Sequence, residues 1–110
     1  MQLNQSKIEW FYYTLDNKVY KLKIASNETD QLKGLSGIKT KPDSYDGMLF
    51  VFKDKKIRAM HNKNVHVDLD ILWVNDFKIV GQDELLAYSK TGLQIVTSDQ
   101  PVNYAIELFK

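Results

Sequence analysis

Polar and apolar residues alternate along much of the chain, with the two-residue period that is typical of half-buried β-strands. An aromatic-rich segment at residues 8–15 is followed by Asp16-Asn17, a pair of residues that favours a tight turn. Residues 18–25 alternate again, with Lys21 and Lys23 on the face that we expect to meet water. The first 25 residues therefore predict a β-hairpin.

Further strands are predicted where short apolar runs lie between polar turns, at residues 47–52, 57–60, 65–74, 77–80, 93–97 and 102–109. Residues 85–88 fit no single pattern. One short helix is predicted at residues 26–34, because Ser26 or Asn27 can cap its start and Lys33-Gly34 suits its end. Together these elements predict a mainly β fold, a compact antiparallel β-barrel-like domain with one short helix that occupies residues 1–110 as a single domain.

The longest predicted strand, residues 65–74, separates two faces. One face is uniformly apolar and is the predicted core face, with Val65, Val67, Leu69, Ile71 and Trp73. The other face is polar at its start and apolar at its end, with Asn64, His66, Asp68, Asp70, Leu72 and Val74. This pattern is typical of a strand that passes from a covered region into solvent or into the mouth of a cavity.

Two interpretations of the polar residues remain open. His66, Asp68 and Asp70 could form a site that shares a metal ion or divides acid and base roles. Alternatively, His66 and Asp68 belong to an ordinary solvated strand face, which is the default in antiparallel sheets. Asp70 lies where the outer face becomes apolar, so it needs a partner. We expect Asp70 to be partly buried and to accept hydrogen bonds from backbone N–H groups or from a cation such as Lys63, and we expect Asp68 to matter less.

Composition excludes several classes of function. The net charge of +1 gives no whole-molecule attraction to nucleic acid or to anionic lipid. The chain has no cysteine, which excludes disulfides, thiolate metal sites and a cysteine nucleophile. No apolar run approaches the length of a transmembrane helix, and residues 1–10 lack the pattern of a signal peptide. Nothing in the sequence indicates a cofactor, a tight metal site or a particular compartment.

Four short blocks resemble, in this order along the chain, the domain-of-unknown-function family 192. The blocks are Gly34-Leu35-Ser36-Gly37, Gly47-Met48-Leu49-Phe50-Val51-Phe52, Lys63-Asn64 and Leu69-Asp70-Ile71. Pro101, Tyr104 and Glu107-Leu108 fit the closing strand of that family. The resemblance covers about residues 25–108, and the family consists of small, uncharacterised bacterial and archaeal proteins. It implies a compact β-barrel-like fold with a short helix.

The chain also departs from the family pattern. His61-Asn62 stands where the family carries Trp-Met, Asp68 where it carries proline, and Ile38 where it carries arginine. The resemblance implies Lys63, Asn64 and Asp70 as candidate ligand-binding residues and gives no support to His66 or Asp68. In a continuous strand Asn64 and Asp70 would lie ~20 Å apart, so a shared ligand requires a bend near Asn64.

Two hypotheses about function follow. The first is a non-catalytic binding module for a small polar ligand or a partner protein, with no nucleic-acid partner. The second is a hydrolase-like or metal-dependent enzyme that uses Asp70 together with His66 or Asp68. We favour the first, because the sequence holds no dense cluster of ionisable residues.

Overall fold

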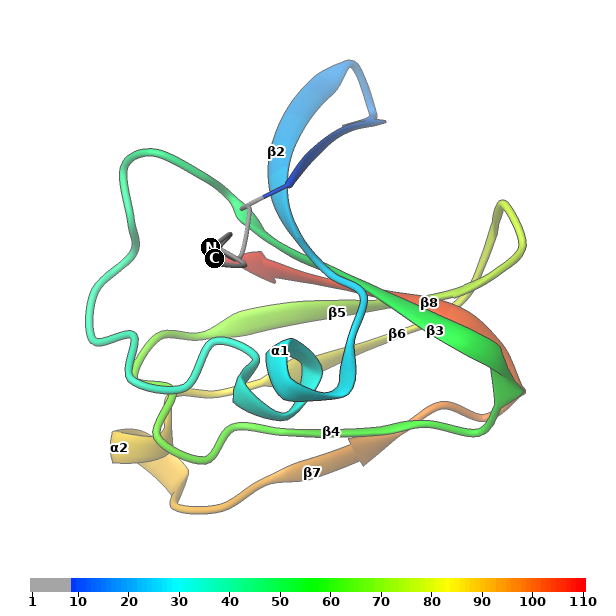
Figure 1. Ribbon diagram of the computed structural model, residues 1–110. Helices are drawn as coiled ribbons and strands as arrows, with labels where there is room; N and C mark the ends of the chain where they lie inside the picture. The colour runs from blue at the N-terminus through cyan, green and yellow to red at the C-terminus, as the bar shows by residue number, and fades with distance from the viewer. Residues whose placement is uncertain (1–8) are drawn as a thin grey trace, which may run out of the picture.

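The computed structural model describes residues 9–110, and in this part of the chain it shows eight strands and two short helices. The strands are β1 (Trp10–Leu15), β2 (Lys18–Ala25), β3 (Gly47–Lys56), β4 (Ala59–His61), β5 (Leu69–Asn75), β6 (Lys78–Leu85), β7 (Ile95–Thr97) and β8 (Val102–Phe109), and the helices are α1 (Glu28–Lys33) and α2 (Tyr88–Thr91). Six strands form one sheet in the order β1-β2-β3-β8-β5-β6, and β4 pairs with β7 in a second sheet (Figure 1).

The predicted N-terminal hairpin is present as β1 and β2. These strands pair antiparallel, and the turn between them places Asp16 and Asn17 at φ 51° and 66°. Asp and Asn tolerate this left-handed conformation better than most residues, which explains their place at the turn. The predicted strand began at residue 8, which lies outside the described residues.

The large sheet is mixed, so the predicted antiparallel pairing is wrong for one pair of strands. β2 and β3 run parallel, because residues 26–46 cross over between them and carry α1 on the way (Figure 1). Asn27 caps α1 as predicted, since its side chain accepts a hydrogen bond from the backbone N–H of Asp30 at 2.8 Å. The second helix, α2, was not predicted, because its four residues contain only turn signals.

The prediction of a compact, mainly β fold is confirmed, whereas a closed barrel is not found. Neither sheet in residues 9–110 closes on itself, and β1 and β6 are the edges of the larger one. Among the described helices, none has the length and the apolar character needed to cross a membrane.

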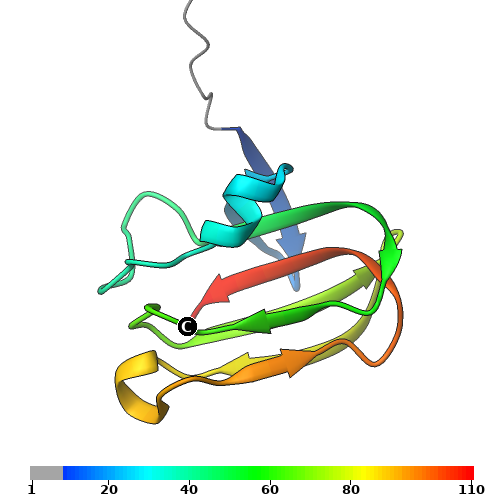
Figure 2. The ribbon, with the colours of Figure 1, turned by 60° about the horizontal axis from the view of Figure 1, so that its bottom comes forward.

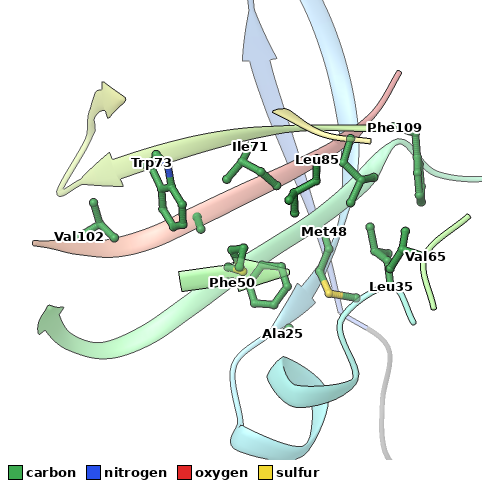
Figure 3. Close-up of a cluster of buried hydrophobic side chains, with 13 residues drawn as sticks. Ala25, Leu35, Met48, Phe50, Val65, Ile71, Trp73, Leu85, Val102 and Phe109 are labelled. Atoms are coloured by element: carbon green, nitrogen blue, oxygen red, sulfur yellow. The ribbon is translucent and has the colours of Figure 1, made fainter. Parts of the chain in front are cut away.

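The six-stranded sheet buries side chains on both faces. The main core lies between this sheet, the β4–β7 pair and the loop that follows α1 (Figure 2). Figure 3 shows Leu35, Val65 and Phe109 at one end of this core and Trp73 and Val102 at the other. A second cluster occupies the opposite face, where Tyr13 and Leu15 of the N-terminal hairpin pack against residues such as Leu72 and Ile106.

The predicted strand at residues 65–74 is shorter than expected. β5 begins at Leu69, and the preceding residues form a loop, because Asn64 adopts φ 59° and the Val65 N–H donates back to the Asn62 carbonyl. Leu69, Ile71 and Trp73 lie in the main core as predicted. Leu72 and Val74 lie in the second cluster, so the apolar end of the outer face is covered rather than solvated.

Candidate functional site

A pocket of about 170 Å³ lies where the end of α1 and its following loop meet β3, β4 and β8. Leu35, Phe50, Met60 and Val65 give it apolar walls. Its ionisable lining residues are Lys33, His61, Lys63 and Glu107. We call this cavity the Glu107 pocket. A cavity of this size suits part of a small molecule and is too small for a folded partner.

Glu107 is the unusual residue of the pocket. It lies on β8 between Met48 of β3 and Ile71 of β5, its direct cross-strand partners. Strand alternation puts its side chain on the same face as Ala105 and Phe109, which belong to the main core. Glu107 is only 3% exposed, and burial raises the pKa of its carboxyl group to about 8. A group in this position is protonated at neutral pH, because burial penalises the charged form.

No compensating interaction offsets the burial of Glu107 among the described residues. Loss of hydration alone accounts for the raised pKa, with no contribution from a neighbouring charge or hydrogen bond. Buried carboxyl groups in proteins normally have hydrogen-bond partners, and an exception requires an explanation. A carboxyl group that lines a cavity and lacks such partners is available to a ligand.

Two loops form one side of the pocket and are held together by backbone hydrogen bonds. The Gly37 N–H donates to the Asn64 carbonyl at 2.8 Å, and the His66 N–H donates to the Ile38 carbonyl at 2.9 Å. Gly34, which ends α1, adopts φ 50°, a conformation that side chains disfavour. These contacts fix Ser36 and Lys63 at the edge of the cavity, since both residues line it.

Asn62 anchors the chain between His61 and Lys63. Its side chain is fully buried, and its Nδ2 group donates to the carbonyls of Leu86 at 2.8 Å and Gly92 at 3.0 Å. Its Oδ1 atom accepts a hydrogen bond from the backbone N–H of Gln94 at 2.7 Å. Asn62 therefore has a structural role, and it leaves His61 and Lys63 to face the pocket.

The three residues that the family resemblance implied do not come together. Lys63 lines the Glu107 pocket with an exposed side chain. Asn64 is also exposed and supports the pocket through its backbone carbonyl. Asp70 is not a lining residue of this pocket, and its carboxylate lies 3.6 Å from the Lys110 ammonium group.

The roles predicted for Asp68 and Asp70 are reversed in the structure. The Asp68 carboxylate accepts a hydrogen bond from the Ala87 N–H at 2.8 Å and another from Lys90 Nζ at 2.6 Å. The hydrogen bond from Lys90 is the main reason why the pKa of Asp68 is lowered. Asp70 is partly buried as predicted, but its cationic neighbour among the described residues is Lys110 at 3.6 Å rather than Lys63. The prediction that Asp68 matters less was wrong because residue 68 precedes β5 and follows no strand alternation.

The residues proposed for catalysis are also dispersed. His66 packs edge-on against Tyr88, with 6.0 Å between ring centroids, and both oxygens of Asp68 already have partners. Within residues 9–110, no group of three or more His, Asp or Glu side chains is placed to hold a metal ion.

Sequence reasoning missed Glu107 and His61 as candidate site residues. A signal for Glu107 was available, because the alternation of residues 102–109 places a charged residue on one face between two apolar residues, Ala105 and Phe109. His61 gave no such signal, since only the packing of β4 beside the loop after α1 brings it to the pocket.

Comparison with known proteins supports the fold and the family. The chain is similar to a crystal structure from Sinorhizobium meliloti 1021 described as that of a candidate transcription regulator, with a TM-score of 0.73 and 22% identity over 96% of this chain and 84% of the other. It is also similar to a protein of unknown function from Novosphingobium aromaticivorans DSM 12444, with a TM-score of 0.74 and 18% identity over 93% of this chain and 73% of the other. No curated protein matches the sequence significantly.

The family comparison covers nearly the whole chain. Residues 12–110 match the model of domain-of-unknown-function family 192, which is described as "Uncharacterized ACR". The matched region contains every block that carried the resemblance, from Gly34 to Leu108, and it also contains the Glu107 pocket. The chain therefore belongs to domain-of-unknown-function family 192.

Proposed function

We propose that this protein is a non-catalytic binding module that holds a small polar molecule in the Glu107 pocket. The observation that carries this proposal is the Glu107 carboxyl group, which is buried, lines a cavity and is compensated by no neighbouring charge or hydrogen bond among residues 9–110. A protein keeps such a group at a cost in stability, and residues kept at that cost are frequently functional.

The distribution of the family motifs supports the same site. Three of the four blocks that carry the resemblance contribute lining residues, namely the loop 34–37, the strand 47–52 and Lys63. The closing strand contributes Glu107. The fourth block, which contains Asp70, lies outside the lining. We therefore retain Lys63 as a ligand-binding residue, give Asn64 a supporting role and leave Asp70 out of the proposed site.

Binding is favoured over catalysis because, among the described residues, no hydrogen bond joins Glu107 to another ionisable residue of the pocket. A catalytic acid, base or nucleophile normally has a hydrogen-bonded neighbour that orients it or exchanges a proton with it. Among the described residues, no side chain forms a hydrogen bond that shifts the pKa of the Glu107 carboxyl group. The alternative enzyme that uses Asp70 with His66 or Asp68 gains no support, because these residues already contact Lys110, Tyr88 and Lys90.

The name of the Sinorhizobium meliloti neighbour raises the question of nucleic acid. The two chains are 22% identical, and a similarity at this level supports a shared fold and not a shared function. With a net charge of +1, the present chain has no large basic excess, so we keep the prediction that nucleic acid is not its partner.

The proposal is tested by titrating ¹⁵N-labelled protein with a panel of small amines, carboxylates and uncharged polar molecules. We expect at least one compound to shift the amide signals of Gly34, Ser36 and Lys63 in a saturable way. Ser36→Tyr places a large side chain in the lining and should abolish the shifts. Ser44→Tyr, in an exposed loop, is the matched control and should leave them unchanged.

Two results would contradict the proposal. One is a panel in which no compound perturbs the pocket at millimolar concentration. The other is a set of shifts confined to the opposite face of the sheet, around Phe77 and Tyr104, where a separate apolar hollow is present.

A further inference from the structure

We propose that the ligand of the Glu107 pocket is a small zwitterionic amine, whose ammonium group meets Glu107 and whose acidic group meets Lys33 and Lys63. This inference rests on the proposed function and adds the chemical class of the ligand. Nothing about the fold or the family assigns such a ligand. The inner end, the walls and the rim of the cavity each favour this class of ligand.

The inner end of the pocket needs a donor of hydrogen bonds. Glu107 is the only acidic residue among those that line the cavity. A carboxylate can accept several hydrogen bonds, and an ammonium group has three N–H donors to offer. Charge-assisted hydrogen bonds are also stronger than neutral ones, and the exclusion of water from a buried site strengthens them further. A ligand carboxylate in the same place would instead meet a carboxyl group with no cation beside it.

The walls favour an organic cation over a hydrated metal ion. Leu35, Met60 and Val65 offer apolar contact to a short carbon chain. Phe50 adds an aromatic ring, and the face of such a ring attracts a cation. A divalent metal ion would need several oxygen or nitrogen ligands. Among the described residues, no three acidic or histidine side chains lie close enough together to bind such an ion.

The rim carries positive charge, whereas the inner end carries the acidic group of Glu107. Lys33 and Lys63 are both exposed lining residues, one at the end of α1 and one in the loop after β4. His61 lies beside them, and its Nδ1 atom accepts the Lys63 N–H at 3.1 Å, so Nε2 is left as a donor. Two lysines repel a ligand with a second positive charge and attract one with an acidic group. An acidic residue in the interior and basic residues at the rim therefore match an amino acid whose ammonium group and acidic group are separated by a carbon chain.

Binding of an ammonium group also moves a proton. The neutral carboxyl group of Glu107 releases its proton to the solvent, and the resulting carboxylate pairs with the ammonium. The titratable groups that line the pocket around it are Lys33 from α1, His61 from β4 and Lys63 from the following loop, whereas β3 and β5 present Met48 and Ile71. Asp83 of β6 lies beyond Ile71, and its carboxylate accepts the Trp73 Nε1–H at 2.7 Å. Binding of the ligand therefore displaces the proton of Glu107.

Isothermal titration calorimetry with three matched probes tests the inference. The probes are 5-aminopentanoate, pentylamine and pentanoate, with shorter and longer homologues of each. We expect the amino acid series to bind best, the amines to bind about threefold more weakly for want of the rim contact, and the carboxylates not to bind. In buffers of different ionisation enthalpy at pH 7, binding should release close to one proton.

Substitutions in the protein test the contacts of the two ends of the ligand one at a time. Glu107→Gln, which keeps the shape of the side chain, should weaken both amine series at least about tenfold and abolish proton release. Lys63→Ala should weaken only the amino acids, and Lys63→Ala combined with Lys33→Ala should bring them to the level of the amines. Lys41→Ala, an exposed lysine outside the pocket lining, is the control and should change neither. Circular dichroism verifies that each variant is folded, and Ser36→Tyr replaces Glu107→Gln if the latter is not.

Failure of this inference can be distinguished from failure of the proposed function. If the amines and amino acids do not bind but a neutral or anionic compound shifts the pocket amides, the ligand class is wrong and the binding site stands. If binding occurs without proton release or survives Glu107→Gln, the ammonium group does not meet Glu107 and the inference is overturned. If no compound of the panel binds at the pocket, both proposals fail.

Discussion

Gly47 of β3 packs against the backbone of Glu107 on β8 so closely that a Cβ atom on Gly47 would lie 1.8 Å from the Glu107 carbonyl oxygen. Real Cβ atoms do not approach a backbone oxygen to this distance. The two strands are central in the larger sheet, so they cannot separate without disturbing their other pairings. Glycine at position 47 is therefore required by the contact that also holds Glu107 in place.

We predict that Gly47→Ala destabilises the protein by about 3 kcal/mol, at the upper end for overpacking, or prevents folding. Urea denaturation measures the effect. Gly81→Ala is the matched control, since the nearest neighbours of its new methyl group would be side-chain atoms of Trp73, the closest at 3.3 Å, and it should cost much less. Equal destabilisation by both substitutions would mean that the β3–β8 contact is looser than the structure shows.

The reversed roles of Asp68 and Asp70 give a second prediction. Asp68→Ala should lower the urea midpoint clearly more than Asp70→Ala, because it leaves the buried Ala87 N–H and the Lys90 ammonium group without their acceptor. Asp70 loses only a contact with the exposed Lys110. A larger effect at Asp70 would contradict the hydrogen bonds described for Asp68.

A third prediction concerns Asn62, which stands at a position where the family pattern has a different residue. Asn62→Ala should destabilise the protein by roughly 2–4 kcal/mol, since it leaves the Leu86 carbonyl and the Gln94 N–H unpaired in a partly buried place. It also removes one of the two hydrogen bonds that the Gly92 carbonyl accepts. Asn75→Ala removes a single exposed hydrogen bond to the Pro101 carbonyl and serves as the control. Thermal unfolding compares the two, and a near-neutral Asn62→Ala would show that water can replace the side chain.

The raised pKa of Glu107 predicts an unusual dependence of stability on pH. Between pH 4.5 and about 8 the folded protein holds a proton on Glu107 that the unfolded chain has released. Stability therefore falls as pH rises through this window, by roughly 5 kcal/mol for this group, and the contribution of Glu107 is level above it. Asp68 has the opposite effect, because its pKa is lowered from the usual value of 3.8 and its contribution to stability is lost as pH falls below that value. The pH windows of Glu107 and Asp68 therefore do not overlap.

Glu107→Gln isolates this effect, because glutamine has the same shape and does not titrate. The difference in unfolding free energy between the variant and the original protein should shift in favour of the variant as pH rises from 5 to 9. A difference that is constant across this range would show that Glu107 titrates alike in the folded and unfolded states.

Much of the fold could be predicted from the sequence because its signals are local. The turn at Asp16-Asn17, the cap at Asn27 and the last strand depend on residues that are close in the chain, and all three are present in the structure. The parallel pairing of β2 with β3 depends on the path of residues 26–46, which no local pattern encodes. The loop before β5 depends on the conformation of Asn64, which a strand-like alternation of residues concealed.

The candidate site could be predicted only in part. Lys63 was identified through the family resemblance, and it lines the pocket. Asp70 was favoured because it lies where the outer face of its predicted strand becomes apolar. Glu107 lies between Ala105 and Phe109 of the main core, and only the pairing of β8 with both β3 and β5 shows that its strand is central in the sheet. The burial of a residue in the middle of a sheet depends on strand order, which a single sequence does not reveal.

The central claim is that a neutral, buried carboxyl group lies at the inner end of the Glu107 pocket. The most direct measurement is the ¹³C chemical shift of the Glu107 side-chain carboxyl group as a function of pH, assigned by comparison with Glu107→Gln. We predict a titration midpoint at about 8. A midpoint near 4.5, the usual value for glutamate, would show that the carboxyl group is charged and hydrated at neutral pH, and it would contradict the proposed site.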